Sequence, residues 1–161
     1  MDAPYTVYGS PGSGSVPLEA ALMLIGAPYE VIGEAGLRDV ARNPAVFKVN
    51  PLGQVPALVL PSGEVMTESA AILIWLADRH PDAGLAPLPT DERQRPAFLR
   101  WMAYVSSAIY GLAWVRADPM RLVSDERQTE VVLERIADRR ADCWHWMDAQ
   151  ISPAASCSAM N

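Results

Sequence analysis

The chain has 161 residues, half of them apolar, and a formal net charge of −6 from 13 basic and 19 acidic residues. Because nucleic acids and anionic membranes are bound through basic surfaces, this charge balance argues against both as partners. The longest apolar run, residues 70–77, is too short to span a bilayer and is expected to form a buried helix.

The first part of the chain predicts a strand, a helix and a second strand. Tyr5–Tyr8 has strand composition and precedes a tight loop rich in serine and glycine. A helix is expected over Val16–Ile25, because Pro17 suits its first turn and Gly26 suits its C-terminal cap. Tyr29–Ile32 is then a second strand, parallel to the first because a helix connects them. The expected unit is βαβ.

A hairpin and a helix complete the predicted N-terminal domain, which ends near residue 80. After a short helix expected near residues 37–42, the apolar residues 57–60 and 65–67 are separated by a Pro-Ser-Gly-Glu turn, which predicts an antiparallel hairpin. A helix is expected over Ser69–His80. The predicted order of this domain, residues 1–80, is therefore βαβ followed by ββα.

Helices are expected in the rest of the chain. Residues 81–90 contain three prolines without periodicity, which predicts a linker. Apolar residues recur at helical spacing from Phe98 to Leu112, and a second long helix is expected from about Ser124. Because residues 151–161 are small, polar and aperiodic, residues 91–161 are expected to form an incomplete all-helical domain.

Two residue pairs indicate what the N-terminal domain binds. Val55-Pro56 ends a loop before an apolar strand, and only an X-Pro bond adopts the cis form at low cost. A cis bond there leaves the Val55 N–H and C=O free to pair with another peptide as a strand would. Glu68 and Ser69 stand at the start of a predicted helix, where N–H groups and the dipole favour a carboxylate. Ser69 can bind the carboxylate of an α-amino acid, and Glu68 can bind its ammonium group.

These residues resemble the glutathione transferase family, whose thioredoxin-like N-terminal domain carries the same Val-(cis)Pro and Glu-Ser pairs. The resemblance covers roughly residues 5–150, with specific motifs only in the first 80. It implies that Val55, Pro56, Glu68 and Ser69 bind glutathione. Gln54 is a further candidate, with simple solvent exposure as the alternative. Ordinary helix capping is the alternative for the Glu68-Ser69 pair.

The resemblance also implies a thiolate nucleophile, because only the ionised thiol of glutathione is competent. A helix N-terminus supplies part of the required stabilisation, and a hydroxyl donor adds ~1.5–3 kcal/mol. The candidate donors are Ser13, then Ser15, then Ser10, with Tyr8 fourth. A helix N-cap is the alternative role of Ser15, and core packing that of Tyr8. Gly14 stands where a related bacterial class has a cysteine, so cysteine-based redox chemistry is not expected.

The implied reaction is the transfer of glutathione to a small apolar electrophile, as in detoxification. Tyr104 and Trp114 are candidates for the wall of the second-substrate pocket, with core packing or a dimer contact as the alternative. A homodimer is expected, and His80 and His145 are too few to predict a metal site. A glutathione-dependent isomerase, dehalogenase or peroxidase would use the same glutathione-binding site and is an alternative. A further alternative is a module that binds glutathione but catalyses no reaction. The last alternative is a defective chain that folds poorly because helices are missing.

The sequence predicts a cytoplasmic location. The first residues lack the basic and apolar regions of a secretory signal. The two cysteines, Cys143 and Cys157, have no metal-ligand or redox spacing. Both are therefore expected to remain reduced thiols.

Overall fold

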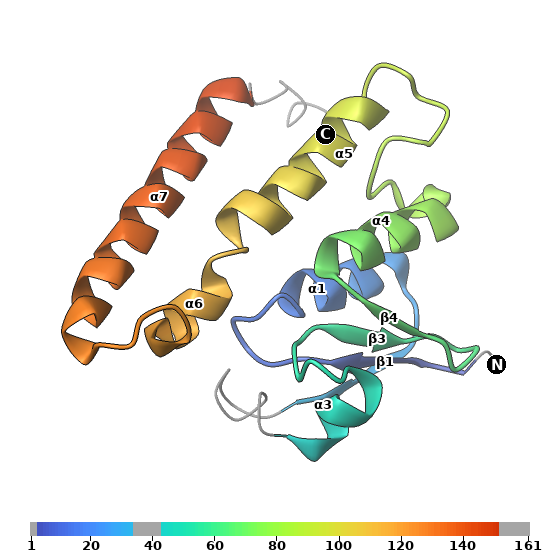
Figure 1. Ribbon diagram of the computed structural model, residues 1–161. Helices are drawn as coiled ribbons and strands as arrows, with labels where there is room; N and C mark the ends of the chain where they lie inside the picture. The colour runs from blue at the N-terminus through green and yellow to red at the C-terminus, as the bar shows by residue number, and fades with distance from the viewer. Residues whose placement is uncertain (1–2, 34–42, 152–161) are drawn as a thin grey trace. The chain divides into compact units, whose positions relative to one another are not determined.

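The computed structural model describes residues 3–33 and 43–151. The chain divides into two compact units, Met1–Ala103 and Tyr104–Asn161 (Figure 1). The short helix predicted near residues 37–42 lies outside the described residues.

The first unit is built on a four-stranded sheet. Strand β1 (Tyr5–Tyr8) pairs in parallel with β2 (Tyr29–Ile32), and helix α1 (Val16–Ile25) connects them. Strand β3 (Ala57–Val59) pairs antiparallel with both β1 and β4 (Val65–Thr67), which gives the order β2-β1-β3-β4. This is the predicted βαβ and ββα arrangement, and the thioredoxin-like fold class is confirmed.

Local sequence signals explain where these elements begin and end. Helix α1 has Pro17 in its first turn and ends at Gly26, whose φ of 73° lies in the left-handed region that glycine tolerates. The turn between β3 and β4 contains Gly63 at a φ of 87°. Helix α4 (Ser69–Arg79) agrees with the predicted helix to within one residue. Helix α3 (Pro44–Val49), which the sequence pattern did not predict, begins after Asn43, whose side chain accepts a hydrogen bond from the Ala45 N–H.

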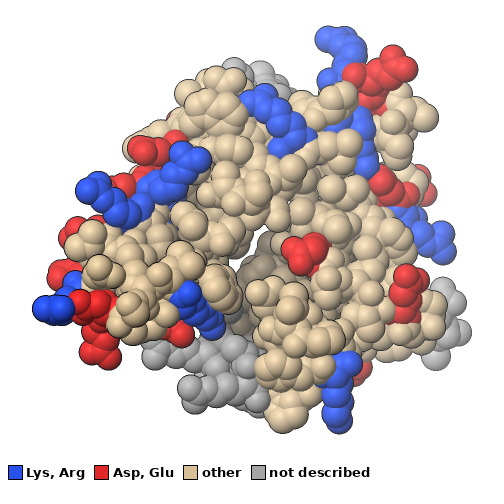
Figure 2. Space-filling model, in the orientation of Figure 1, with Lys and Arg blue, Asp and Glu red and all other residues tan. Residues whose placement is uncertain are grey.

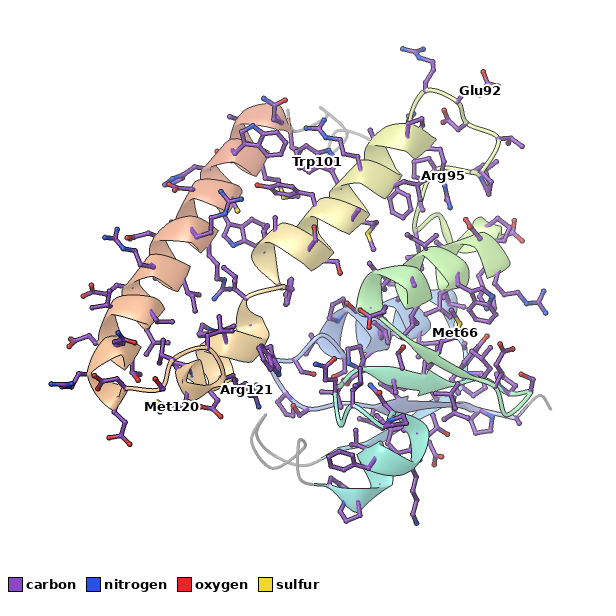
Figure 3. The ribbon with its side chains drawn as sticks, viewed as in Figure 1. Met66, Glu92, Arg95, Trp101, Met120 and Arg121 are labelled. Carbon is purple, nitrogen blue, oxygen red and sulfur yellow. The ribbon has the colours of Figure 1, made fainter. Side chains whose placement is uncertain are left out.

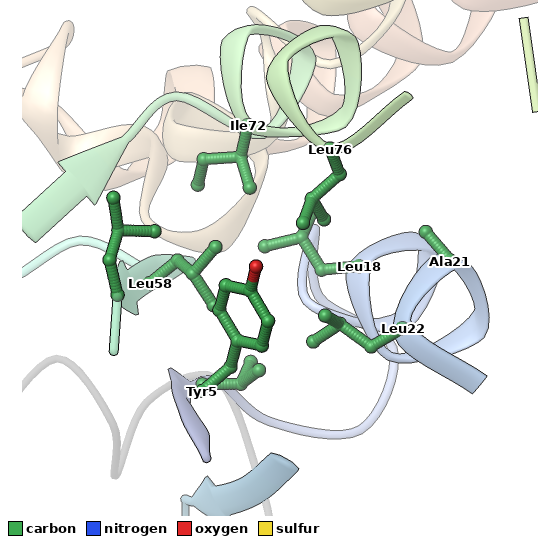
Figure 4. Close-up of a cluster of buried hydrophobic side chains, with 9 residues drawn as sticks. Tyr5, Leu18, Ala21, Leu22, Leu58, Ile72 and Leu76 are labelled. Atoms are coloured by element: carbon green, nitrogen blue, oxygen red, sulfur yellow. The ribbon is translucent and has the colours of Figure 1, made fainter. Parts of the chain in front are cut away.

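Helices α1 and α4 cover one face of the sheet and enclose the core, while α3 lies on the other face (Figures 1 and 4). Successive side chains of a strand point to opposite faces, so Tyr5 and Val7 enter the core and Thr6 and Tyr8 do not. The core consists of nine buried side chains: Tyr5, Val7, Leu18, Ala21, Leu22, Leu58, Leu60, Ile72 and Leu76. The first unit therefore has one continuous hydrophobic core.

Helix α5 (Arg95–Tyr104) is tied to the first unit at its start (Figure 3). The guanidinium of Arg95, a residue that is only 8% exposed, contacts both carboxylate oxygens of Asp78 at 2.8 Å and donates to the Pro87 carbonyl at 3.0 Å. Between Asp78 and Arg95 the chain forms a short 3₁₀ turn, η1 (Pro81–Ala83). The division into units falls later, after Ala103, and the linker proposed over residues 81–90 stays a prediction.

The second unit is helical and interrupted. A π-helical segment, η2 (Val105–Ile109), continues from α5 and is followed by α6 (Ala113–Ala117). The prediction of one helix from Phe98 to Leu112 is therefore wrong in its second half. Gly111 explains the break, because a Cβ there would collide with the Ser107 carbonyl oxygen, and glycine is a poor helix former.

A long helix completes the second unit. The 3₁₀ turns η3 (Pro119–Arg121) and η4 (Glu126–Gln128) lead to α7 (Thr129–Gln150), which buries Ile136 and Cys143. None of the helices within residues 3–33 and 43–151 has the length and apolarity needed to cross a membrane. On the face shown in Figure 2, basic and acidic side chains are interspersed among uncharged ones.

Candidate functional site

The loop between β1 and α1 is held by hydrogen bonds among its serines. The Oγ of Ser13 accepts the N–H of Ser10 at 3.2 Å and the N–H of Ser15 at 3.1 Å. The same hydroxyl donates to the Ser15 Oγ at 3.0 Å. Two backbone donors and one hydroxyl acceptor therefore fix the position of the Ser13 oxygen.

Ser15 is completely buried at the start of α1. Its single hydroxyl proton has two acceptors within reach, the Glu19 Oε1 at 3.0 Å and the Ser10 carbonyl at 3.3 Å. Although Ser15 occupies the N-cap position, its side chain makes no capping hydrogen bond. Its Cβ and Oγ instead occupy the space that a side chain at Gly9 would need. Side-chain capping, the alternative considered for Ser15, is therefore not what this hydroxyl does.

Ser10 and Tyr8 differ from the other two candidate donors. The Ser10 hydroxyl is buried and has no hydrogen-bond partner among the described residues. Ser10, together with Val16, Glu19 and Val31, lines a hollow of about 450 Å³. Tyr8 is half-buried and lies on the face of the sheet opposite to the core cluster, so core packing does not describe it.

Gly14 brings three distant segments of the chain together. A Cβ at Gly14 would lie 3.0 Å from the Pro56 Cδ and 3.6 Å from the Ser69 Cβ. The serine loop, the Val55-Pro56 pair and the Glu68-Ser69 pair therefore meet at one place in the first unit. Only a residue without a side chain fits this approach without displacing a neighbour.

Val55 presents a backbone with unused hydrogen-bonding groups. The Val55-Pro56 peptide bond is cis, Pro56 is buried, and Val55 is half-buried. Within the described part of the chain, neither the N–H nor the C=O of Val55 has a hydrogen-bond partner. The preceding turn is held by Asn50, whose side chain donates to the Gln54 carbonyl at 2.9 Å and accepts the Leu52 N–H at 3.1 Å. The sequence did not predict a role for Asn50, which stands five residues before Val55.

Glu68 has a strained backbone. Its φ of 65° makes it the single non-glycine residue with a positive φ among those described. Such a conformation costs ~1–3 kcal/mol and is concentrated at functional sites. Glu68 is exposed and occupies the N-cap position of α4, yet its side chain makes no capping hydrogen bond. Ordinary capping therefore does not account for Glu68, and Ser69 beside it is half-buried at the first position of the helix.

The two candidates for a second-substrate pocket lie on different helices. Tyr104 ends α5, where its hydroxyl donates to the Cys143 carbonyl at 3.1 Å and its ring lies 4.8 Å from that of Trp146. Burial raises the pKa of the Tyr104 phenol, and a hydrogen bond with Cys143 acts in the same direction. Trp114 lies in α6, 45% exposed, with the Arg121 guanidinium 4.9 Å from its ring.

No metal-binding group was found in the part of the chain that the structure describes. Within residues 3–33 and 43–151, no three histidine, cysteine or acidic side chains are placed to share an ion. The candidate site offers hydroxyl groups, backbone amides and the carboxylates of Glu19 and Glu68.

Several known proteins are similar to this chain. Residues 15–79 match the family described as "Glutathione S-transferase, N-terminal domain". The uncharacterized GST-like protein YncG of Escherichia coli K12 is 33% identical over 147 residues, which cover 91% of this chain and 69% of that protein. The maleylacetoacetate isomerase of Pseudomonas aeruginosa is 39% identical over 83 residues, which cover 50% of this chain and 38% of the isomerase.

A solved structure extends the similarity to three dimensions. It is a glutathione transferase homologue from Sulfitobacter, crystallised with bound glutathione. Its TM-score with this chain is 0.81 at 26% sequence identity, and the match covers 94% of this chain and 71% of that chain.

Proposed function

This chain belongs to the glutathione transferase family, and on that premise we propose that it binds glutathione and transfers the thiol to a small apolar electrophile. The observation that supports the proposal most strongly is the meeting of three segments at Gly14. Each segment offers a different group to a γ-glutamyl tripeptide: a free backbone, a charged pair at a helix start, and hydroxyl groups.

Glutathione would be held by the two residue pairs. The unpaired N–H and C=O of Val55 suit the backbone of the cysteinyl residue, as in the addition of a strand to a sheet. The Ser69 hydroxyl and the start of α4 suit the γ-glutamyl carboxylate, and Glu68 suits the ammonium group. The strained backbone of Glu68 supports a binding role. The exposed Gln54 is proposed to hydrogen-bond to the glycyl end or to the backbone of glutathione.

Ser13 is the first candidate for the hydroxyl that stabilises the thiolate. The two backbone N–H bonds to its oxygen make the hydroxyl a stronger donor, because neighbouring hydrogen bonds polarise one another. Turning its proton from Ser15 to the sulfur exchanges a bond worth ~1 kcal/mol for a charged one worth ~1.5–3 kcal/mol. Ser10, Ser15 and Tyr8 remain the other candidates, and the unpartnered hydroxyl of Ser10 makes it the main rival.

The energy needed for ionisation can be compared with these contributions. Lowering a thiol pKa of about 8.5 by two units requires ~3 kcal/mol. A helix N-terminus contributes ~0.3–1 kcal/mol, and up to ~2 kcal/mol when partly buried. The hydroxyl donor supplies most of the remainder. Catalysis would then depend on the ionised thiol and on its proximity to the electrophile.

A glutathione-dependent isomerase is the second candidate function. The specific observation in its favour is the 39% identity to a protein named maleylacetoacetate isomerase. The same glutathione site would serve either reaction, because both begin with attack by the thiolate on a carbon electrophile. A cytoplasmic homodimer acting in detoxification completes the proposal, and sedimentation of the purified chain tests the dimer.

Calorimetric titration of reduced glutathione into the full chain tests the proposal. Saturable binding that is lost in the double variant Glu68→Ala, Ser69→Ala is the expected result. The matched control is Ser62→Ala, Glu64→Ala, which removes the same two side chains from an exposed turn. Absence of binding by the folded chain would overturn the proposed function.

Turnover assays then separate the two activities. A transferase conjugates glutathione to a chlorodinitrobenzene, whereas an isomerase converts a maleyl compound to its fumaryl form without consuming glutathione. Ser13→Ala is expected to lower the rate at saturating glutathione more than Ser10→Ala, and saturating conditions are needed because the Ser13 hydroxyl also holds the loop. The reverse order would assign the thiolate donor to Ser10.

A further inference from the structure

The carboxylate of Glu19 ends a chain of side-chain hydrogen bonds that begins in the serine loop. Ser13 donates to Ser15 at 3.0 Å, and Ser15 donates to the Glu19 Oε1 at 3.0 Å. We infer that Glu19 is a positioning residue, which acts through Ser15 and Ser13 to hold the loop at the glutathione site. The inference about binding rests on the proposed function, but the loop geometry can be tested without any ligand.

Glu19 is the nearer and the charged one of two acceptors for the Ser15 proton. The Glu19 carboxylate lies at 3.0 Å and the Ser10 carbonyl at 3.3 Å, and because both can only accept, the Ser15 oxygen is left to accept from Ser13. The Ser13 oxygen then accepts the N–H groups of Ser10 and Ser15. One side chain on a regular helix thereby orders hydroxyl and amide groups in a loop that has no regular structure.

This loop needs such an anchor, because it contains glycines at two critical places. Gly12 has a φ of 75°, and Gly14 lies between the two serines of the chain. Glycine loses more conformational freedom on ordering than any other residue, so a loop of this composition is costly to hold in one form. Fixing Ser13 and Ser15 on either side of Gly14 fixes its close approach to Pro56 and Ser69. Glu19 therefore acts on the wall of the site from a distance.

A purely helical role for Glu19 makes different predictions. Acidic residues in a first helical turn stabilise the helix through its dipole, whatever their side chains touch. Glu19→Asp keeps the charge but shortens the side chain, so the carboxylate no longer reaches Ser15. Glu19→Gln removes the charge but keeps an acceptor oxygen at the same length. If Glu19 positions the loop, the Glu19→Gln variant should behave like the native protein and the Glu19→Asp variant should not. If Glu19 acts only through the helix dipole, the Glu19→Asp variant should behave like the native protein and the Glu19→Gln variant should not.

Amide hydrogen exchange measured by NMR on the ligand-free full chain is the direct test. The Ser10 and Ser15 N–H groups, which bond to Ser13, are expected to exchange about tenfold faster in Glu19→Asp, equivalent to ~1.4 kcal/mol. Glu19→Gln is expected to change them by less than about threefold. Glu30→Asp is the matched control, since the Glu30 carboxylate also accepts from a hydroxyl, that of Thr6 at 2.9 Å. Unchanged exchange in a folded Glu19→Asp variant would overturn the inference.

Titration of glutathione into the same three variants separates this inference from the proposed function. A chain that binds glutathione is expected to lose about tenfold in affinity with Glu19→Asp and little with Glu19→Gln or Glu30→Asp. Equal affinities in a binding chain would overturn the positioning role alone. A native chain that binds no glutathione would overturn the proposed function, while the exchange rates would still decide the role of Glu19 in the loop.

Discussion

The two units of this chain bury their apolar residues to different extents. In the first unit, Leu22, Leu58 and Ile72 are 0% exposed within a nine-residue core. Both units carry exposed apolar side chains, such as Leu52 and Leu122, but among the described residues of the second unit only four apolar side chains are buried: Ile109, Val115, Ile136 and Cys143. Because burial stabilises in proportion to the apolar area removed from water, the first unit contributes most of the hydrophobic stabilisation. All the proposed glutathione-binding residues lie in this better-packed unit.

A core truncation should expose the largest difference between the units. Leu58→Ala is expected to lower the free energy of unfolding by ~2–5 kcal/mol, because it leaves a cavity among rigid neighbours. Leu122→Ala in the second unit should stay within ~0.5 kcal/mol of the native protein, since its side chain is mostly in water. Urea unfolding of both variants measures the two free energies. Equal losses of stability would contradict the difference in burial between the units.

The ion pair at the start of α5 tests where the first unit ends. Arg95→Met is expected to cost ~1–3 kcal/mol, because it leaves the Asp78 carboxylate and the Pro87 carbonyl without this donor. The Asp78 side chain is 36% exposed, so water replaces part of what is lost. Arg93→Met on the exposed turn before α5 is the control. If both variants unfold at the same urea concentration as the native protein, this pair does not hold α5 to the first unit.

Gly14→Ala tests the close approach at the candidate site. A methyl group 3.0 Å from the Pro56 Cδ must displace the proline ring slightly, which is expected to cost ~1–2 kcal/mol of stability. Glutathione affinity should fall as well, whereas Ser62→Ala in a distant turn should change neither quantity. Thermal unfolding and calorimetry measure the two effects. Native affinity in Gly14→Ala would mean that the three segments do not form one binding wall.

Tyr104→Phe should have the smallest effect and sharpens the description of the second unit. Loss of the hydroxyl removes the bond to the Cys143 carbonyl and is expected to cost ~0.5–1.5 kcal/mol. Tyr110→Phe, at a residue that is 48% exposed, is the control. A large loss of turnover with unchanged stability would instead favour the pocket role proposed for Tyr104.

Much of the first unit is predictable because its signals are local. The bounds of β1, α1 and β2 agree with the prediction, since Pro17, Gly26 and short apolar runs mark them. Helix α3 has too few apolar residues for a periodic signal, although Asn43 before Pro44 is a readable start. The π-helical segment at Val105 was not predicted, because Val105, Ile109 and Leu112 keep the apolar spacing of a regular helix.

The candidate site was predictable as a set of motifs but not as an arrangement. The Val55-Pro56 and Glu68-Ser69 pairs could be predicted as site residues because cis-proline and helix starts have their own local chemistry. Glu19 was missed, although its spacing of four residues from Ser15 places both on one side of a helix. No local rule indicates that such a carboxylate accepts from a loop hydroxyl rather than from water.

The sequence alone determined the strands, the main helices of the first unit, the fold class and the family resemblance, because these depend on the order of residues and their spacing. Only the tertiary structure decided that Gly14 lies against Pro56 and Ser69, that Glu68 has a strained backbone, and that Ser15 bonds to Glu19. These contacts arise when residues distant along the chain are packed around one core. Packing depends on the shape of the whole unit, whereas propensity depends on a few neighbouring residues.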